Sequence, residues 1–302
     1  MSEGAFGGPA EGAAIVQPAP AKLNLTLHIT GKRTDGYHEL DSLVAFADLQ
    51  DTISVRPAAE IGLNVEGPFA PALADEPDNL VLKAARALAA AANVSDGAAI
   101  GLIKRLPVAG GIGGGSADAA AALRALAMLW KIDLGAPDLV GLAMELGADV
   151  PVCLAGRASY MSGAGERLDP APRLPPAALV LANPTRPLAT KAVFDAFDGR
   201  FSAADRFERP PADACELAEL LATRHNDLAD PARRCLPEIG TILDVLDAAP
   251  GALLTRMSGS GPTCFALFES DTEADHAAAE IASAHPDWWV RAGRLVTDVG
   301  AL

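Results

Sequence analysis

A run of glycines between residues 107 and 116 constrains this chain more than any other part of its sequence. It reads Pro107-Val-Ala-Gly-Gly-Ile-Gly-Gly-Gly-Ser116, with five glycines in six positions. The apolar residues 100–106 before it predict a strand, and the spacing of apolar residues in 117–130 predicts an amphipathic helix after it. Glycine admits positive φ and lets the backbone approach a ligand, so amide groups and the helix N-terminus can point at phosphate oxygens. The strand, loop and helix together therefore favour a phosphate-binding loop over a flexible linker.

Three common phosphate motifs fit this loop poorly. The P-loop pattern needs a lysine after its glycines, and none follows here. The dinucleotide pattern G-x-G-x-x-G fits only as far as Gly113, because Ser116 stands where the third glycine or alanine belongs. Asp133 lies at the distance that the dinucleotide motif requires, but it follows a predicted helix rather than a second strand. The H-R-D and D-F-G motifs of protein kinases are also missing from the sequence.

Charge and hydropathy exclude several classes of partner. The formal net charge of -15 and the pI of about 4.7 would repel a nucleic-acid backbone, so no nucleic-acid partner is expected. Charged residues interrupt every long apolar stretch before it reaches the roughly 18 residues of a membrane span, so no membrane association is expected. Residues 1–19 lack the basic start and the apolar run of a secretory signal, and we expect them to form a frayed tail.

The cysteines point to a reducing compartment. None of the four forms a C-x-x-C pair or shows metal-ligand spacing, and we interpret them as reduced thiols of a cytoplasmic protein: Cys153, Cys215, Cys235 and Cys264.

The length of 302 residues suggests two domains, and the order of predicted elements suggests an α+β, two-domain protein. Residues 21–30 alternate apolar and polar side chains, as expected for a half-buried strand. The segment 156–176 is rich in glycine, proline and charge and predicts the boundary between domains at 13–160 and 161–302. Further strands are expected at 43–46, 52–55, 178–182 and 264–268, and further helices at 79–92 (with Asp78 near its start), 137–146, 217–224, 239–247 and 273–284.

The glycine loop resembles the phosphate motif of the GHMP kinase superfamily, with Ile112 in place of the usual leucine. The resemblance extends to four other segments: Pro20-Ala-Lys-Leu-Asn-Leu-Thr-Leu, Gly36-Tyr-His with Glu39-Leu, Leu146-Gly-Ala-Asp-Val-Pro151, and Met257-Ser-Gly-Ser-Gly-Pro262. It implies an N-terminal domain like domain 2 of ribosomal protein S5 and a ferredoxin-like C-terminal domain. ATP and substrate would then bind in the cleft between the two domains.

The same resemblance assigns catalytic and nucleotide-binding residues. It implies that Asp149 is the catalytic acid/base and that Lys22 is its positively charged neighbour. By residue type alone, Asp149 would suit a helix cap and Lys22 an exposed strand lysine. ATP would be bound by Pro107, Ala109, Gly110, Gly111, Ile112, Gly113, Gly114, Gly115, Ser116, Lys104 and Asn79. Magnesium should accompany the nucleotide, with Ser116 as a hydroxyl candidate and the other ligands unassigned.

Within the superfamily, the Gly-Tyr-His element resembles kinases that act on a small-molecule substrate, cytidine diphosphate-linked methylerythritol, in the non-mevalonate isoprenoid pathway. The implied activity is ATP-dependent phosphorylation of its 2-hydroxyl. Tyr37 and Phe194 would stack on the two faces of the cytosine and His38 would meet its polar edge. The other implied substrate contacts are Asn24 and Thr190 at the methylerythritol end and Gly259 and Gly261 near the phosphates.

Two alternatives remain at this point. A sister GHMP kinase acting on a sugar, homoserine or a mevalonate derivative would share the loop but would not need Tyr37 or His38. A dinucleotide-dependent oxidoreductase would be protected against thermal unfolding by NAD rather than by ATP. An inactive nucleotide-binding regulator is disfavoured, because Lys22 and Asp149 are both present. Oligomeric state has no signature in the sequence.

Overall fold

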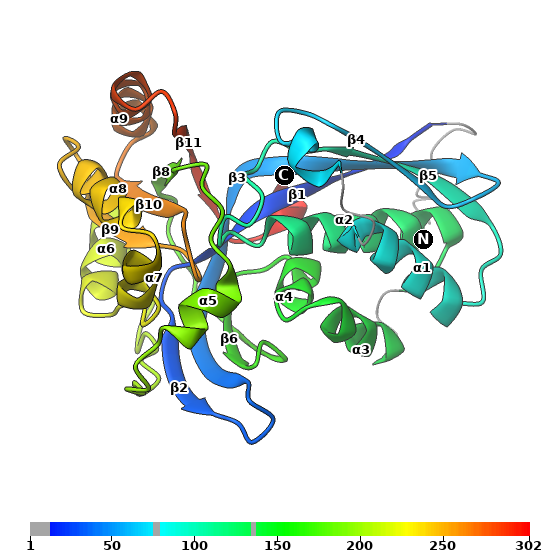
Figure 1. Ribbon diagram of the computed structural model, residues 1–302, viewed down its shortest axis with the longest axis horizontal. Helices are drawn as coiled ribbons and strands as arrows, with labels where there is room; N and C mark the ends of the chain where they lie inside the picture. The colour runs from blue at the N-terminus through cyan, green and yellow to red at the C-terminus, as the bar shows by residue number, and fades with distance from the viewer. Residues whose placement is uncertain (1–12, 75–78, 134–136) are drawn as a thin grey trace, which may run out of the picture.

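The computed structural model describes residues 13–74, 79–133 and 137–302 of the chain. An N-terminal and a C-terminal half lie side by side, and both contribute strands to a shared sheet (Figure 1). The main path of that sheet runs β4-β5-β3-β11-β8-β10-β9.

The N-terminal half is built around one long strand, β3 (His38–Ala58), of 21 residues. Within this half it pairs antiparallel with four strands: β1 (Ile15–Asn24), β2 (His28–Lys32), β5 (Gly97–Ile103) and β6 (Ser159–Gly163). Two shorter strands extend this part of the sheet: β4 (Gly62–Glu66), parallel to β5, and β7 (Arg167–Pro170), antiparallel to β6. Figure 1 shows the hairpin of β2 and the start of β3 projecting from the body of the molecule.

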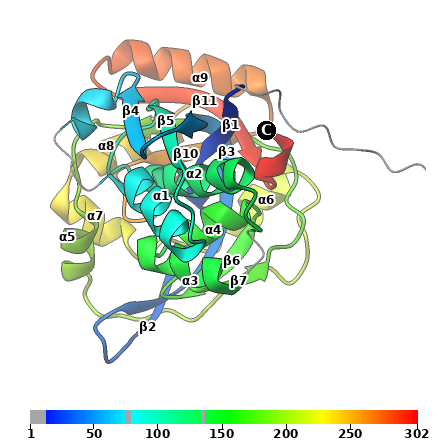
Figure 2. The ribbon, with the colours of Figure 1, turned by 90° about the vertical axis from the view of Figure 1, so that its right-hand side faces the viewer.

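Helices cover one face of this half (Figure 2). They are α1 (Leu80–Ala91), α2 (Gly114–Trp130), α3 (Pro137–Leu146) and α4 (Val150–Ala155), with a 3-10 turn η1 (Ala70–Leu73) nearby. Alanines make up much of the buried surface of α2, and their small side chains let the helix lie close to β1 and β3. The N-terminus of α2, where the glycine loop ends, is thereby held against the sheet.

The C-terminal half has the β-α-β-β-α-β order of a ferredoxin-like domain. Its strands are β8 (Ala178–Asn183), β9 (Leu254–Met257), β10 (Cys264–Phe268) and β11 (Trp289–Val296), arranged β11-β8-β10-β9, which is 4-1-3-2 in chain order. α8 (Glu238–Asp247) and α9 (Asp271–Ala284) share a core with one face of these strands. The remaining elements are α5 (Thr190–Asp195), α6 (Ala214–Ala222), α7 (Ala229–Cys235) and a terminal 3-10 turn η2 (Val299–Ala301).

Strand pairing and a shared core are among the contacts that join the halves. β11 pairs with β3 through Leu295 opposite Ala47 and Val296 opposite Phe46. A third hydrophobic core, which includes Leu23 of β1 and Phe265 of β10, lies between the halves. The expected two-part architecture is thus confirmed, and the division at residue 160 stays a prediction.

The structure corrects the prediction for residues 21–30. They do not form one strand, because β1 ends at Asn24 and β2 begins at His28. The predicted polar face is not solvated either, since Lys22, Asn24 and His28 are all buried. The C-terminal half covers this segment, as the backbone bridge between Leu27 and Asn226 shows.

Other sequence predictions were wrong in extent. Residues 43–46 and 52–55 belong to the single strand β3. The segment 156–176 is less irregular than expected, since it contains the hairpin of β6 and β7, and β6 also pairs with β3. Its assignment as the domain boundary stays a prediction. Residues 15–19, expected in a frayed tail, form the first part of β1, whereas residues 1–12 and Asp78 lie outside the described residues.

The helix at 137–146 and the strand at 264–268 are confirmed with the predicted bounds. Among the described residues, no helix combines the length and the apolar character needed to cross a membrane.

Candidate active site

A cavity of about 1300 Å³ lies between the two halves, lined by residues from both. The predicted site residues line it, with the exception of Ile112 and Gly261: Lys22, Asn24, Tyr37, His38, Asn79, Lys104, Pro107, Ala109, Gly110, Gly111, Gly113, Gly114, Gly115, Ser116, Asp149, Thr190, Phe194 and Gly259. Ile112 is fully buried in the core between the halves, and Gly261 lies behind the lining against Gly111.

The glycine loop is fixed by hydrogen bonds to its carbonyl groups. The backbone N–H of Lys22 donates to Ile112 O at 2.8 Å, and that of Thr263 donates to Gly110 O at 3.0 Å. The first amide groups of an α-helix have no partner inside the helix, and Gly114, Gly115 and Ser116 of α2 line the cavity. The loop therefore offers amide donors to an anion, as a phosphate site requires.

Two glycines of the loop are required by its close packing. Gly111 has φ 73°, and a side chain there would collide with the backbone of Gly261 and Ser258. Gly113 has φ 61°, and an added Cβ would lie 3.1 Å from Cε of Lys22. At Gly115, by contrast, an added Cβ would meet no atom within 4 Å.

Asp149 and Lys22 form an ion pair beside this loop. The distance between Lys22 Nζ and Asp149 Oδ2 is 2.9 Å, with side-chain exposures of 3% and 33%. Lys22 lies opposite Phe46 on β3, so its side chain points to the face of the sheet where the helices pack. Asp149 occupies the N-cap position of α4, but its side chain makes no capping hydrogen bond. Residue type alone suggested a helix cap for Asp149 and an exposed position for Lys22. The structure shows neither, because Asp149 makes no capping hydrogen bond and Lys22 is buried.

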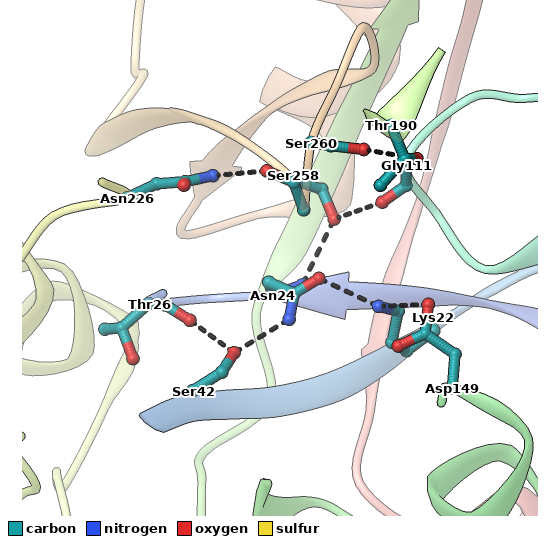
Figure 3. A network of polar contacts seen from close by, with 11 residues as sticks. Lys22, Asn24, Thr26, Ser42, Gly111, Asp149, Thr190, Asn226, Ser258 and Ser260 are labelled. Carbon is teal, nitrogen blue, oxygen red and sulfur yellow. Dashed lines mark hydrogen bonds and ion pairs between the residues drawn. The ribbon is translucent and has the colours of Figure 1, made fainter. Parts of the chain in front are cut away.

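Asn24 connects the ion pair to both halves of the protein (Figure 3). Its Oδ1 accepts a hydrogen bond from Lys22 Nζ at 2.9 Å, and its Nδ2 donates to Ser42 Oγ at 2.7 Å. Its backbone N–H donates to Ser258 Oγ, which in turn donates to Gly111 O, each at 3.1 Å. One buried network therefore positions Lys22, the glycine loop and the C-terminal half together.

The second glycine turn, residues 258–261, is held from two sides. Asn226 Nδ2 donates to Met257 O and Gly259 O, both at 2.8 Å. The hydroxyl groups of Thr190 and Ser260 lie 2.9 Å apart, which ties the start of α5 to the turn. Thr190 and Gly259 are thus brought to the same wall of the cavity.

Lys104 belongs to a buried charge cluster that the sequence did not predict. Its Nζ lies 2.7 Å from Asp51 Oδ2 and 2.5 Å from Asp118 Oδ2, and all three side chains are at most 3% exposed. Burial raises the pKa of Asp118 to about 7, although the positive charge of Lys104 opposes this shift. The two carboxylates in turn raise the pKa of Lys104 against the effect of its own burial. A charged residue in the otherwise apolar first turns of α2 was a signal for Asp118, whereas nothing in the sequence marked Asp51.

Asn79 combines a place in the cavity wall with a structural role. Its Oδ1 accepts a hydrogen bond from Val81 N at 2.9 Å and so caps α1.

Aromatic residues gather at the other end of the cavity. The rings of His38 and Phe194 are stacked with centroids 5.1 Å apart, and Phe197 meets His38 edge-on. Tyr37 is 65% exposed at the tip of the hairpin between β2 and β3. Burial, and to a lesser extent the charge of Lys32, lowers the pKa of His38, which favours the neutral imidazole.

Comparison with protein families gives two matches. Residues 79–157 match the model for the GHMP kinases N terminal domain, and residues 212–287 match the model for GHMP kinases C terminal. The second match covers the middle of the ferredoxin-like half.

Full-length relatives give a closer assignment. The chain is 53% identical over 288 residues to the 4-diphosphocytidyl-2-C-methyl-D-erythritol kinase of Rhodospirillum rubrum, covering 95% of each chain. It is 55% identical over 279 residues to the kinase of the same name from Paramagnetospirillum magneticum, covering 92% of this chain and 98% of that protein.

Solved structures agree with the relatives. A crystal structure of 4-(cytidine 5'-diphospho)-2C-methyl-D-erythritol kinase superposes with a TM-score of 0.75 at 36% identity, covering 93% of this chain and 99% of that one. A homoserine kinase from Cytophaga hutchinsonii, at 17% identity and a TM-score of 0.73 over 98% of this chain and 99% of its own, shares the fold. With its glycine loop, its two-part fold and these relatives, the chain belongs to the 4-diphosphocytidyl-2-C-methyl-D-erythritol kinase family of the GHMP kinases.

Proposed function

We propose that this kinase transfers the γ-phosphate of ATP to the 2-hydroxyl of 4-diphosphocytidyl-2-C-methyl-D-erythritol, a step of the non-mevalonate route to isoprenoid precursors. The observation that carries the proposal is the Lys22–Asp149 ion pair, which lies against Gly113 of the glycine loop in a cavity that the aromatic residues also line. A phosphate donor on the loop and an acceptor held by the aromatic residues would meet at this pair.

Phosphoryl transfer from ATP to a hydroxyl group needs no covalent intermediate with the protein. Phosphoryl transfer passes through a loose transition state, so catalysis depends on positioning and on stabilising charge. Asp149, which is partly exposed to the cavity, orients the acceptor hydroxyl and takes its proton late in the transfer. The ammonium group of Lys22, held by Asp149 and Asn24, offsets the negative charge that develops.

The triphosphate would bind to backbone amides of the glycine loop. The carbonyl groups of Gly110 and Ile112 are occupied by hydrogen bonds from the scaffold, which fixes the loop before ATP arrives. Gly115 has open space on its Cα, so the start of α2 can be approached closely. Asn79 and Lys104 line the wall where the nucleoside end would extend.

Magnesium fits the oxygen donors in this part of the cavity. The hydroxyl of Ser116 and the carboxylates of Asp118 and Asp149 all line it, and Oδ1 of Asp118 is a buried oxygen without a hydrogen-bond partner. Hard oxygen ligands are those that Mg²⁺ prefers. We expect Ser116 to supply the hydroxyl ligand. Bound there with the β- and γ-phosphates, the ion would neutralise phosphate charge.

The aromatic end of the cavity suits a cytosine. Stacking on an aromatic side chain is worth about 1 to 3 kcal/mol per base, and we assign Tyr37 and Phe194 to the two faces of the ring. The neutral imidazole of His38 offers one donor and one acceptor for the polar edge of the base. Asn24 and Thr190 would contact the methylerythritol end, and the turn containing Gly259 and Gly261 would contact the diphosphate.

We also infer a cytoplasmic enzyme whose partners are small molecules. All four cysteines are free thiols, as in a reducing compartment. The net charge of -15 disfavours binding to nucleic acid.

An assay for ADP release with a panel of acceptors tests the proposal. We expect turnover with 4-diphosphocytidyl-2-C-methyl-D-erythritol and only background ADP release with homoserine, mevalonate or galactose. Comparable or greater turnover with one of those three would show that the protein is a GHMP kinase with a different substrate. Product analysis by phosphorus NMR would locate the new phosphate ester.

A further inference from the structure

Two histidines and an aspartate form a cluster outside the kinase cavity. His28 is the first residue of β2, and His225 and Asp227 belong to the segment before α7. One potential ligand atom from each of the three lies within 4.8 Å of the other two. His225 Nε2 is 2.8 Å from Asp227 Oδ1, and the rings of His28 and His225 meet edge to face with centroids 4.7 Å apart.

His28 is the unexplained member of the cluster. Its side chain is 2% exposed, yet neither ring nitrogen has a hydrogen-bond partner among the described residues. A buried polar group without a partner costs about 1 to 3 kcal/mol, so a fold retains one only when something else satisfies it. A ligand shared with His225 and Asp227 would do so.

We propose that His28, His225 and Asp227 form a binding site for a divalent transition-metal ion, and that this ion is Zn²⁺. Two imidazole nitrogens and one carboxylate oxygen are a ligand set that Zn²⁺ accepts, whereas Mg²⁺ and Ca²⁺ prefer oxygen alone. The fourth position would be filled by water. This site is separate from the magnesium site expected at the glycine loop.

The environment of the cluster suits a cation. Burial, and next the neighbouring His225, lower the pKa of His28, whereas the nearby carboxylates raise it. Asp41 and Asp205 also face His28, but they are paired with Arg206 and Arg224. Asp227 has no arginine partner among the described residues, and although its Oδ1 also accepts a hydrogen bond from Ser202 Oγ at 3.0 Å, it is the carboxylate that an ion would meet.

An ion can reach the cluster from solvent. His225 and Asp227 line a second cavity of about 600 Å³, and the His225 side chain is 58% exposed. Ligand atoms around a tetrahedral zinc lie roughly 3 to 3.5 Å apart, given bond lengths near 2 Å. Rotation of the exposed His225 ring supplies the adjustment that this spacing needs.

The ion would connect the two halves beside the kinase cavity. Asp227 Oδ2 accepts a hydrogen bond from Ile29 N at 2.6 Å, and Leu27 and Asn226 form a backbone bridge. Asn226 lies between His225 and Asp227 in the sequence, and its Nδ2 donates a hydrogen bond to Gly259 O of the second glycine turn. Metal binding would therefore stabilise the pairing of β2 with the 225–227 segment.

Metal binding is measured on the whole protein after a chelator has been used and then removed. We expect calorimetry with Zn²⁺ to give one ion per chain, and Co²⁺ at the site to give the intense visible absorption of tetrahedral coordination. His28→Phe keeps an apolar ring in the buried position, and His225→Ala changes an exposed residue. Each variant should weaken Zn²⁺ binding by at least about 10-fold.

His276→Ala is the matched control, because His276 pairs with Glu280 on α9 and belongs to no group of three potential metal ligands in the part of the chain that the structure describes. Its Zn²⁺ affinity should equal that of the unmodified protein, and an excess of Mg²⁺ should not displace Zn²⁺. Unchanged Zn²⁺ affinity in His28→Phe would mean that His225 and Asp227 alone bind the ion, and would overturn the proposal. The absence of stoichiometric Zn²⁺ binding to the unmodified protein would also overturn it. If His28→Phe does not fold, Asp227→Asn replaces it, with the same expected loss.

Discussion

The carboxylate of Asp149 stands at the N-cap of α4 but is directed to the ammonium group of Lys22, 2.9 Å away, instead of to the helix. An aspartate in this position ordinarily caps the helix, with a gain of about 1 kcal/mol. Asp149 makes no capping hydrogen bond, and Lys22 of β1 holds its carboxylate next to the glycine loop. This geometry is what a role in catalysis would require.

Asp149→Asn tests that role. The amide keeps the size of the side chain but cannot accept the proton of the acceptor hydroxyl, so we expect turnover to fall on the order of 100-fold or more. ATP affinity should stay nearly unchanged, because the loop binds phosphate through its backbone. Steady-state ADP release and calorimetry with ATP give the two values. Asp244→Asn, an exposed carboxylate on α8, is the control, and near-normal turnover in Asp149→Asn would remove Asp149 from the mechanism.

The two glycines Gly113 and Gly115 should respond differently to alanine. Gly113→Ala combines a positive φ with a Cβ 3.1 Å from Lys22, so we expect a lower melting temperature of the ligand-free protein. Gly115→Ala adds its methyl group to open space in the first turn of α2 and should keep or raise that temperature. Differential scanning calorimetry compares them, and equal melting temperatures would contradict the packing described for the loop.

Tyr37→Ala should weaken binding of the cytidine nucleotide. Loss of one stacking contact, worth about 1 to 3 kcal/mol, corresponds to an increase in Kd of about 5- to 150-fold. Cytidine diphosphate is a sufficient probe for calorimetry. Trp288→Ala, which removes an aromatic ring stacked on His285 outside the cavity, should leave the Kd unchanged. If Tyr37→Ala behaves like this control, the tyrosine does not stack on the base.

Lys104→Met should strongly destabilise the fold. Removal of the ammonium group leaves Asp51 and Asp118 buried without their positive partner, at a cost of about 3 to 5 kcal/mol. Arg157→Met breaks an ion pair with Asp298 that is exposed on both sides, and should cost less than about 1 kcal/mol. Urea unfolding of both variants measures the difference, and similar costs would show that the buried cluster adds nothing beyond an exposed pair.

Asp118 should give the stability of the protein a specific pH dependence. Its pKa is about 7 in the folded protein, against 3.8 as the reference for the unfolded chain. Between these values the folded state binds the extra proton, so the free energy of unfolding falls as pH rises from about 4 to about 7 and levels off above. Asp118→Asn should lose this part of the slope. Urea unfolding at intervals across that range provides the test, and parallel curves for the two proteins would rule out the elevated pKa.

Local patterns in the sequence predicted the elements that are regular along the chain. The glycine loop, α2 and β10 were found because spacing and composition specify them without reference to distant residues. β11 was missed, since Arg291, Gly293 and Arg294 interrupt its apolar pattern, and its place depends on pairing with β3 and β8.

The same distinction applies to the cavity. Lys22 and Asn24 were named from a motif, but their burial results from the C-terminal half covering a strand that looked half-exposed. Asp51 could not be connected to Lys104, because the two are 53 positions apart in the sequence and meet only in the folded sheet. Motifs thus named the groups that we propose to react, and tertiary contacts supplied the groups that hold them.

The length of β3 has a mechanical consequence. The strand begins at His38 beside the aromatic end of the cavity and pairs with β11 through Phe46 and Ala47. A hinge rotation of one half against the other would have to break this ladder and expose the core between the halves. We therefore expect any opening and closing around bound molecules in peripheral parts of the chain, above all the projecting hairpin of β2 and the start of β3 (Figure 1), and not between the two halves.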